Sequence, residues 1–265
     1  MRAALLLSLA MVPATAAFAG PGVPSEIAAA TAIENAVLAR TRTPANVVRD
    51  KYRHPEQTLK FFDVTPDQTI VEYSPGGGGW YTEILAPLTN GKGTLYAAQA
   101  PGKGYDALVA KFAADPATYG AVKLVPWPPE GGIPAGSVDT LLTFRNIHNM
   151  VMDGTAEANF QRFFTVLKPG GVLGIVDHRL PEDRDVALEK KSGYLKLSTV
   201  RALAEKAGFV LEAQSEINAN PKDTADWPDG VWTLPPSYQL GDVDRAKYAA
   251  IGESDRMTLR FRKPK

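Results

Sequence analysis

Short apolar runs alternate with longer stretches of helical periodicity from about residue 68 to the end of the chain. In the longer stretches the apolar residues recur about every three to four positions, which favours amphipathic helices. This alternation is typical of repeated βα units and predicts an α/β fold with a doubly wound, mostly parallel sheet of seven strands. The strands are expected at residues 69–73, 94–98, 122–125, 138–144, 172–177, 209–216 and 257–262. The helices between them are expected at residues 81–88, 105–113, 157–167 and 199–207.

Two helical stretches precede the first strand, one from Ser25 to about Arg40 and one over residues 44–62. A segment rich in proline, aspartate and tryptophan, residues 218–255, precedes the last strand. Irregular segments of that length inside a compact domain tend to be lids or binding loops. The pattern therefore predicts an N-terminal linker with two helices at residues 20–67. An α/β domain follows at residues 68–265, with 218–255 as an insertion or lid.

The N-terminus has the layout of a secretory signal peptide. Arg2 precedes an apolar run over residues 3–12, and the small residues that follow end in an Ala17-x-Ala19 motif. The apolar run is too short to span a bilayer, so no stable membrane anchor is expected. We therefore expect a signal peptide at residues 1–19 and export to the periplasm.

The composition excludes several classes of function. Hydrophobic residues make up 45% of the 265 residues and charged residues 22%, as in ordinary globular proteins. Lysine plus arginine and aspartate plus glutamate both number 29, and no basic block stands out. Nucleic-acid binding depends on concentrated positive charge, so no nucleic-acid partner is expected. The chain has no cysteine, which excludes disulfides, thiolate metal ligands and a cysteine nucleophile.

Residues 70–81 read as a strand, a glycine run and the start of a helix. Glycine lets a ligand approach the backbone, and the free N–H groups at the start of a helix favour anionic groups. Several classes of nucleotide-binding protein use such a loop. Tyr81 stands where a dinucleotide-binding fingerprint would need its third glycine, and the Gly-Lys-Ser/Thr of a P-loop is absent.

The spacing Glu72-x-Ser74-x-Gly76-x-Gly78 resembles the first motif of class I S-adenosylmethionine-dependent methyltransferases, with serine in place of the first glycine. Segments 137–142, 167–173 and 207–209 are similar to later landmarks of that family and occur in the same order. A group of exported predicted methyltransferases, marked by Pro-Gly-Gly-Gly-Trp-Tyr-Thr-Glu and a terminal Glu-Ser-Asp-Arg-Met, is more similar still. The resemblance implies that S-adenosylmethionine is the cofactor and that the acceptor is a small molecule or an envelope component. The residues implied in cofactor binding are Glu72, Ser74, Pro75, Gly76, Gly77, Gly78, Tyr81, Gln99, Trp127 and Asn146.

Two positions depart from the family pattern. Gln99 stands where the family has an acid that binds the ribose hydroxyls, and a glutamine accepts hydrogen bonds only through its amide oxygen. After the third strand the chain has Trp127 beside prolines, where the family often has an acid near the adenine. Trp127 either stacks on the purine or packs into the wall of the domain. Glu72 is expected to organise the glycine loop through backbone N–H groups.

Two of the three histidines follow predicted strands, at the edge where open α/β sheets bind ligands. His148 follows the fourth strand and is the candidate general base for methyl transfer. Alternatively, it bonds to a backbone carbonyl and fixes the loop. Asp177 ends the fifth strand and His178 follows it, and the two residues either orient the substrate or cap the strand end together with Arg179.

The segment before the last strand raises two further alternatives. Two roles are expected for its aromatic residues: they either form a lid for an apolar acceptor or pack the long loop onto the sheet. These residues are Trp227, Trp232, Tyr238 and Tyr248. Residues 252–256 carry two acids, a base and a hydroxyl, and are expected to form a salt-bridged turn.

We therefore weigh two functions. The first is a methyltransferase that uses S-adenosylmethionine and a small-molecule acceptor. The second is an exported ligand-binding or accessory protein that keeps the fold without catalysis, which fits Gln99 and the export of a protein whose cofactor is made in the cytoplasm. A hydrolase or metalloenzyme is disfavoured, because there is no Gly-x-Ser-x-Gly elbow and His148, Asp177 and His178 have no recognisable metal-ligand spacing.

Overall fold

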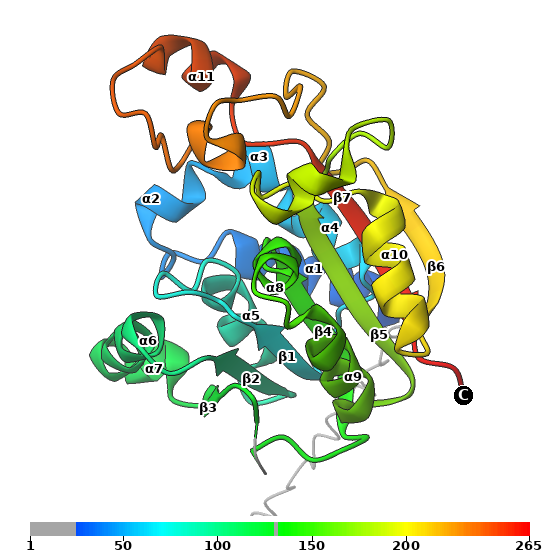
Figure 1. The fold of residues 1–265 in the computed structure, drawn as a ribbon. Helices are drawn as coiled ribbons and strands as arrows, with labels where there is room; N and C mark the ends of the chain where they lie inside the picture. The colour runs from blue at the N-terminus through cyan, green and yellow to red at the C-terminus, as the bar shows by residue number, and fades with distance from the viewer. Residues whose placement is uncertain (1–24, 130–131) are drawn as a thin grey trace, which may run out of the picture.

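The computed structural model describes residues 25–129 and 132–265. Its seven-stranded sheet has the order β3-β2-β1-β4-β5-β7-β6 (Figure 1). All neighbouring strands are parallel except β7, which runs antiparallel to both β5 and β6. This confirms the predicted doubly wound, mostly parallel sheet. The strands are β1 (Thr69–Tyr73), β2 (Thr94–Gln99), β3 (Lys123–Pro126), β4 (Val138–Phe144), β5 (Leu167–His178), β6 (Val210–Ser215) and β7 (Arg256–Arg262).

The central strands are buried on both faces, as expected of a parallel sheet covered by helices on two sides. Successive side chains in a strand point to opposite faces. In β4, Leu141 therefore joins one core cluster and Leu142 the other. Both residues are fully buried. This double burial explains why the strands could be recognised in the sequence as short, nearly continuous apolar runs.

Helices cover both faces of the sheet (Figure 1). The first core cluster packs β4 and β5 against Phe160 and Val200 of two helices, and the second packs the sheet against Ile33 and Ile84 of two others. The helices are α1 (Ser25–Val37), α2 (Pro44–Val47), α3 (Asp50–Arg53), α4 (Pro55–Phe61), α5 (Thr82–Thr89), α6 (Lys103–Ala114), α7 (Pro116–Tyr119), α8 (Ile147–Met152), α9 (Ala156–Val166), α10 (Leu197–Lys206) and α11 (Arg245–Ile251). Two 3-10 helices are η1 (Val186–Lys190) and η2 (Gly230–Thr233).

The N-terminal region differs from the prediction. The single helix expected over residues 44–62 is divided into the three short helices α2, α3 and α4. The break before α4 occurs at His54, which has a left-handed φ of 41° and precedes Pro55. A residue before proline is disfavoured in the α-helical region, so the chain turns there. The turn separates α3, whose Arg53 pairs with Glu253, from α4, whose Leu59 packs in the second core cluster.

The segment over residues 218–255 carries η2 and α11 and lies over the same end of the molecule as α2 and α3 (Figure 1). Contacts join the two regions: Arg49 and Arg53 pair with Glu253, and a Cβ on Gly252 would lie 2.7 Å from the Tyr52 ring. The N-terminal helices α2 and α3 and the segment over residues 218–255 therefore pack together at one end of the domain.

Among the described helices, none combines the length and apolar character needed to cross a membrane. The predicted signal peptide at residues 1–19 lies outside the described residues.

The contact of Gly174 in β5 with Phe62 gives a test of how the N-terminal helices dock. A Cβ at Gly174 would lie 2.8 Å from Leu142 Cδ2 and 2.8 Å from Phe62 Cγ. We expect Gly174→Ala to lower the free energy of unfolding by about 1–3 kcal/mol, because overpacking a closed core forces its neighbours apart. Urea unfolding measures the change. Gly132→Ala is the control, since its Cβ would lie 3.5 Å from Val125 Cγ1; equal stability of the two variants would contradict the packing.

Candidate functional site

The two central strands end in residues with unusual backbone conformation. Ser74, directly after β1, has φ 53°, and Arg145, directly after β4, has φ 64°. A residue with a side chain loses roughly 1–2 kcal/mol in this left-handed region, which glycine enters freely. Ser74 is the position where the methyltransferase motif that this segment resembles has its first glycine, and here a serine adopts a conformation that favours glycine. Strain of this kind is concentrated at functional sites.

The glycine loop is tied to the end of β2. The backbone N–H of Gly76 donates to Gln99 Oε1 at 2.9 Å. Added Cβ atoms at Gly76 and Gly78 would meet nothing within 4 Å, so both positions border open space. Gly77 differs, because its Cβ would lie 2.9 Å from Ala107 Cβ in α6. Gly77 is therefore glycine so that α6 can pack against the loop, whereas Gly76 and Gly78 leave the backbone accessible.

Glu72 has another role than the one expected from the sequence. Its carboxyl Oε2 accepts a hydrogen bond of 2.6 Å from Thr82 Oγ1 at the start of α5, so it links β1 to that helix. The loop amide that bonds to a side chain is that of Gly76, and its partner is Gln99. Burial raises the pKa of Glu72 to about 8, against the opposing effect of the Thr82 hydrogen bond. Glu72 is therefore protonated at neutral pH.

Asn146 joins the ends of β1 and β4. Its Nδ2 lies 3.2 Å from the Tyr73 carbonyl oxygen, 3.2 Å from that of Ser74 and 3.1 Å from that of Phe144. One amide group thus serves carbonyls of two neighbouring strands just where each strand stops. Asn146 positions the site by fixing the separation of these strand ends.

Trp127 packs into the wall of the domain. It is 4% exposed, its Nε1 donates to Asn159 Oδ1 at 2.7 Å, and its ring meets Tyr73 edge-on at a centroid distance of 5.2 Å. No open ring face remains for a purine, so the stacking expected as one alternative has no support and we remove Trp127 from the site. Tyr81 is also 4% exposed and stacks on Phe144.

His148 and Asp177 form a buried pair at the ends of β4 and β5. His148 Nδ1 lies 2.8 Å from Asp177 Oδ1, and the two residues are 4% and 0% exposed. Asp177 Oδ2 accepts from the backbone N–H groups of Ile147 and His148 at 2.6 and 3.2 Å, and Oδ1 accepts from that of His178 at 2.8 Å. The carboxylate is thereby fixed and directs Nδ1 of His148 towards itself. The other ring nitrogen, Nε2, is the one available to a ligand.

His178 lies beside this pair, with 5.0 Å between the ring centroids of the two histidines. Its Nδ1 is hydrogen-bonded to Ser254 Oγ, and its Nε2 accepts from Arg145 Nε at 3.4 Å. Burial, followed by the nearby His148 and Arg145, lowers the pKa of His178 well below its usual range. His178 is therefore neutral, and its polar atoms are committed to neighbouring side chains.

The donor atoms of His148, Asp177 and His178 lie within 4.8 Å of one another, a spacing that could suit a metal ion. The hydrogen bonds of Asp177 argue against this use. Its two oxygens already accept three backbone N–H groups and the His148 ring, which fills the roughly four acceptor sites of a carboxylate. A metal would have to displace bonds that hold the ends of β4 and β5 together.

Two cavities adjoin these residues. The glycine-loop cavity, of about 200 Å³, is bordered by Ser74, Pro75 and Gly78 on one side and by arginines on the other. The histidine cavity, of about 160 Å³, is bordered by His148, His178 and Trp232. Arg145 borders both. A ligand in one cavity is therefore one side chain away from a ligand in the other.

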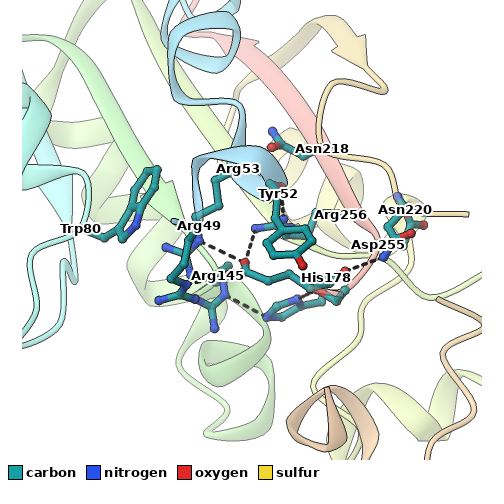
Figure 2. Close-up of polar contacts among 12 residues, drawn as sticks. Arg49, Tyr52, Arg53, Trp80, Arg145, His178, Asn218, Asn220, Asp255 and Arg256 are labelled. Atoms are coloured by element: carbon teal, nitrogen blue, oxygen red, sulfur yellow. Dashed lines mark hydrogen bonds and ion pairs between the residues drawn. The ribbon is translucent and has the colours of Figure 1, made fainter. Parts of the chain in front are cut away.

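The sequence analysis missed the arginines of the site. Arg49, Arg53, Arg145 and Arg256 surround Glu253, and Figure 2 shows Arg49 next to Arg145 with Arg53 approaching from α3. The salt-bridged turn predicted at residues 252–256 is confirmed by the ion pairs of Glu253 and by that of Asp255 with Arg179. No sequence signal separated these arginines from surface ones, because only their burial distinguishes them.

The aromatic residues of the insertion divide between the two roles that the sequence left open. Trp232 contacts the His148 ring edge-on at a centroid distance of 6.2 Å and borders the histidine cavity. Tyr248 is 4% exposed and packs against Trp227, whose Nε1 donates to Asp223. Trp232 thus faces the site, Trp227 and Tyr248 hold the segment in place, and the fourth residue, Tyr238, packs against the Arg245 guanidinium at 3.9 Å from its ring centroid.

Comparison with solved structures agrees with this architecture. A S-adenosylmethionine-dependent methyltransferase from Aquifex aeolicus superposes with a TM-score of 0.57 at 16% identity, covering 88% of this chain and 98% of the other. The chain has the class I methyltransferase fold. The [4+2]-cyclase SpnF shares this methyltransferase fold, with a TM-score of 0.56 at 16% identity and coverage of 92% and 98%. The sequence matches no family model and no curated protein.

The protonated carboxyl of Glu72 predicts a pH-dependent stability. The folded protein holds this proton more tightly than the unfolded chain, whose glutamates titrate near about 4.3. The stabilising effect is complete below the unfolded pKa and is lost as pH rises towards the folded pKa of about 8. Glu72→Gln has no such proton and keeps an acceptor for Thr82. We expect the stability of the variant relative to wild type to rise between about pH 5 and pH 8, by up to about 1.4 kcal/mol per pH unit.

Thermal unfolding over that pH range measures the effect. Glu205→Gln, at an exposed acid on α10, is the control and should track wild type at every pH. A constant difference between Glu72→Gln and wild type would show that Glu72 is ionised in the folded protein.

Proposed function

We propose that the protein is a S-adenosylmethionine-dependent methyltransferase with His148 as the general base. One observation carries the proposal: His148, held by the buried Asp177, borders a cavity that shares Arg145 with the cavity at the glycine loop. The likeness of the fold to solved methyltransferases supports the same reaction class. We propose a small molecule or an envelope component as the acceptor.

The residues of the glycine loop fit the cofactor. Gly76 and Gly78 leave open space where a side chain would stand, which is what close approach of a ligand to the backbone needs. Gln99 Oε1 accepts from Gly76, and its second lone pair remains for a ribose hydroxyl. Ser74 and Pro75 border the same cavity. When bound, S-adenosylmethionine supplies an activated methyl group for direct transfer.

The catalytic work of the protein is alignment and proton removal. Asp177 accepts from Nδ1 of His148, so the free Nε2 is a base directed into the histidine cavity. The carboxylate would also stabilise the imidazolium that forms when Nε2 takes the proton of the acceptor. Neutral His178 adds no positive charge that would oppose this protonation.

The second candidate is a ligand-binding protein that keeps the fold without catalysis. It is supported by Gln99, whose amide oxygen holds the glycine loop where the family has a free acid. The structural likeness to SpnF, which is named as a cyclase, adds only that the fold by itself does not establish methyl transfer. The two candidates differ in whether the loop binds the cofactor.

Calorimetric titration with S-adenosylhomocysteine separates the candidates. We expect the wild type to bind it and Gly78→Val to bind at least about tenfold more weakly, because the added side chain would occupy the open space above the loop. Gly78 does not have a positive φ, so valine should leave the fold and the melting temperature intact. His148→Gln is the control and should bind like wild type. A folded wild type without affinity would favour the second candidate.

We also propose that the protein is exported and that processing leaves Gly20 as the first residue. The proposal rests on the n-region, the apolar run and the Ala17-x-Ala19 motif. Intact-mass measurement on protein secreted from the native host should give the mass of residues 20–265. A mass that still includes Met1 would contradict processing at this site.

A further inference from the structure

Four arginines from distant segments meet beside the glycine loop, and we call them the arginine cluster. Arg49 and Arg53 come from the turn before α3 and from its end, Arg145 follows β4, and Arg256 begins β7. Arg53 and Arg256 are 5% and 2% exposed. Arginine is rarely buried unless its charge is paired, so the source of the compensating charge is the question.

Glu253 supplies part of that charge. Its Oε1 pairs with Arg49 Nε at 2.7 Å, and its Oε2 pairs with Arg53 Nε at 3.1 Å and with Arg256 Nη1 at 3.2 Å. Burial alone would raise the pKa of Glu253, but Arg53, Arg256, Arg49 and Arg145 together lower it to about 2. Glu253 is therefore ionised, yet it brings one negative charge to four positive ones.

The other titratable groups nearby do not neutralise the positive charge that Glu253 leaves uncompensated. Glu72 borders the same cavity but is protonated at neutral pH, since burial raises its pKa to about 8. His178 is neutral. The oxygens of Asp177 are occupied by backbone N–H groups and by His148, so this carboxyl makes no ion pair with the arginines. The cluster therefore keeps a surplus of positive charge next to a cavity.

Some hydrogen-bond donors of the cluster also lack a partner in the part of the chain that the structure describes. The Nη2 atoms of Arg49 and Arg53 are buried without a hydrogen-bond partner among the described residues. Among the described residues, Arg145 pairs with no carboxylate. Its Nε donates to His178 Nε2 at 3.4 Å. Arg49, Arg53 and Arg145 all border the glycine-loop cavity. Guanidinium groups directed into one cavity match the oxygens of a carboxylate or a phosphate.

We propose that the arginine cluster binds an oxyanionic group, a phosphate or a carboxylate, of the molecule on which the protein acts. Bound S-adenosylmethionine offers the cluster a single carboxylate, and its sulfonium and ammonium groups add positive charge of their own, so the surplus of the cluster would remain. Arg145 borders both cavities, so an acceptor in the histidine cavity can reach the cluster. The assignment of the anion to a methyl acceptor rests on the proposed function. The existence of the anion site does not depend on it.

Titration with inorganic phosphate tests the site. Ionic strength is held constant with sodium chloride, since screening alone would weaken any charge effect. We expect phosphate to bind wild type and to raise its melting temperature, because a ligand of the folded state stabilises it. Arg145→Gln should weaken binding at least about tenfold. This variant leaves the ion pairs of Glu253 in place.

Arg201→Gln is the matched control, because Arg201 lies exposed on α10 and should not affect phosphate binding. If Arg145→Gln does not fold, Arg49→Gln takes its place, since Arg53 and Arg256 would still pair with Glu253. Equal affinity of wild type and the cluster variant, or no phosphate binding by wild type, would overturn the proposal.

Phosphate titration in the presence of saturating S-adenosylhomocysteine separates the two possible sources of the anion. Independent binding of both supports an anionic group on a separate molecule. Displacement of phosphate would show that the cluster holds the carboxylate of the cofactor, which overturns the proposal. If phosphate binds through Arg145 while S-adenosylhomocysteine does not bind, the anion site stands and the proposed methyl transfer fails.

Discussion

The ion pairs of Glu253 hold the site end of the molecule together. Its carboxylate joins Arg49 and Arg53, about 200 positions earlier in the chain, to Arg256 at the start of β7. Breaking a buried ion pair by removing one partner costs about 3–5 kcal/mol, because the remaining charge is left without compensation. The N-terminal helices are therefore fixed over the strand ends by charge as well as by apolar packing, and the glycine-loop cavity exists because they are there.

Amide side chains fix the framework around that cavity. Asn146 binds carbonyls at the ends of β1 and β4, and Gln99 binds the glycine loop from the end of β2. Both residues were expected to touch the cofactor; in the structure Asn146 joins two strand ends and Gln99 joins β2 to the glycine loop. The two cavities are bordered by Gly78 of the glycine loop, by His148 and by the side chains of Arg49, Arg53 and Arg145. Neutral backbone donors and surplus cationic side chains thus face the same small volume.

The strands of the sheet were predicted from the sequence more accurately than the N-terminal helices. The first and fourth strands begin and end as predicted, at Thr69–Tyr73 and Val138–Phe144, because double burial makes the apolar run as long as the strand. The helix predicted over residues 44–62 was wrong as one element: the stretch forms three short helices, and the break before the last of them is at the left-handed residue His54. The burial of Trp127 and the link from Glu72 to Thr82 depend on neighbours far away in the sequence, so no local pattern could assign them.

The sequence by itself determined the α/β architecture, the glycine loop and the position of His148 and Asp177 at neighbouring strand ends. These features follow from periodicity and from the order of strands, which are local properties of the chain. Only the tertiary structure decided that the two side chains pair, and that Arg49, Arg53 and Arg145 are directed into a cavity. An arginine has the same side chain on a surface and in a core; its burial, its counter-charge and its free donors are set by segments that meet only after folding.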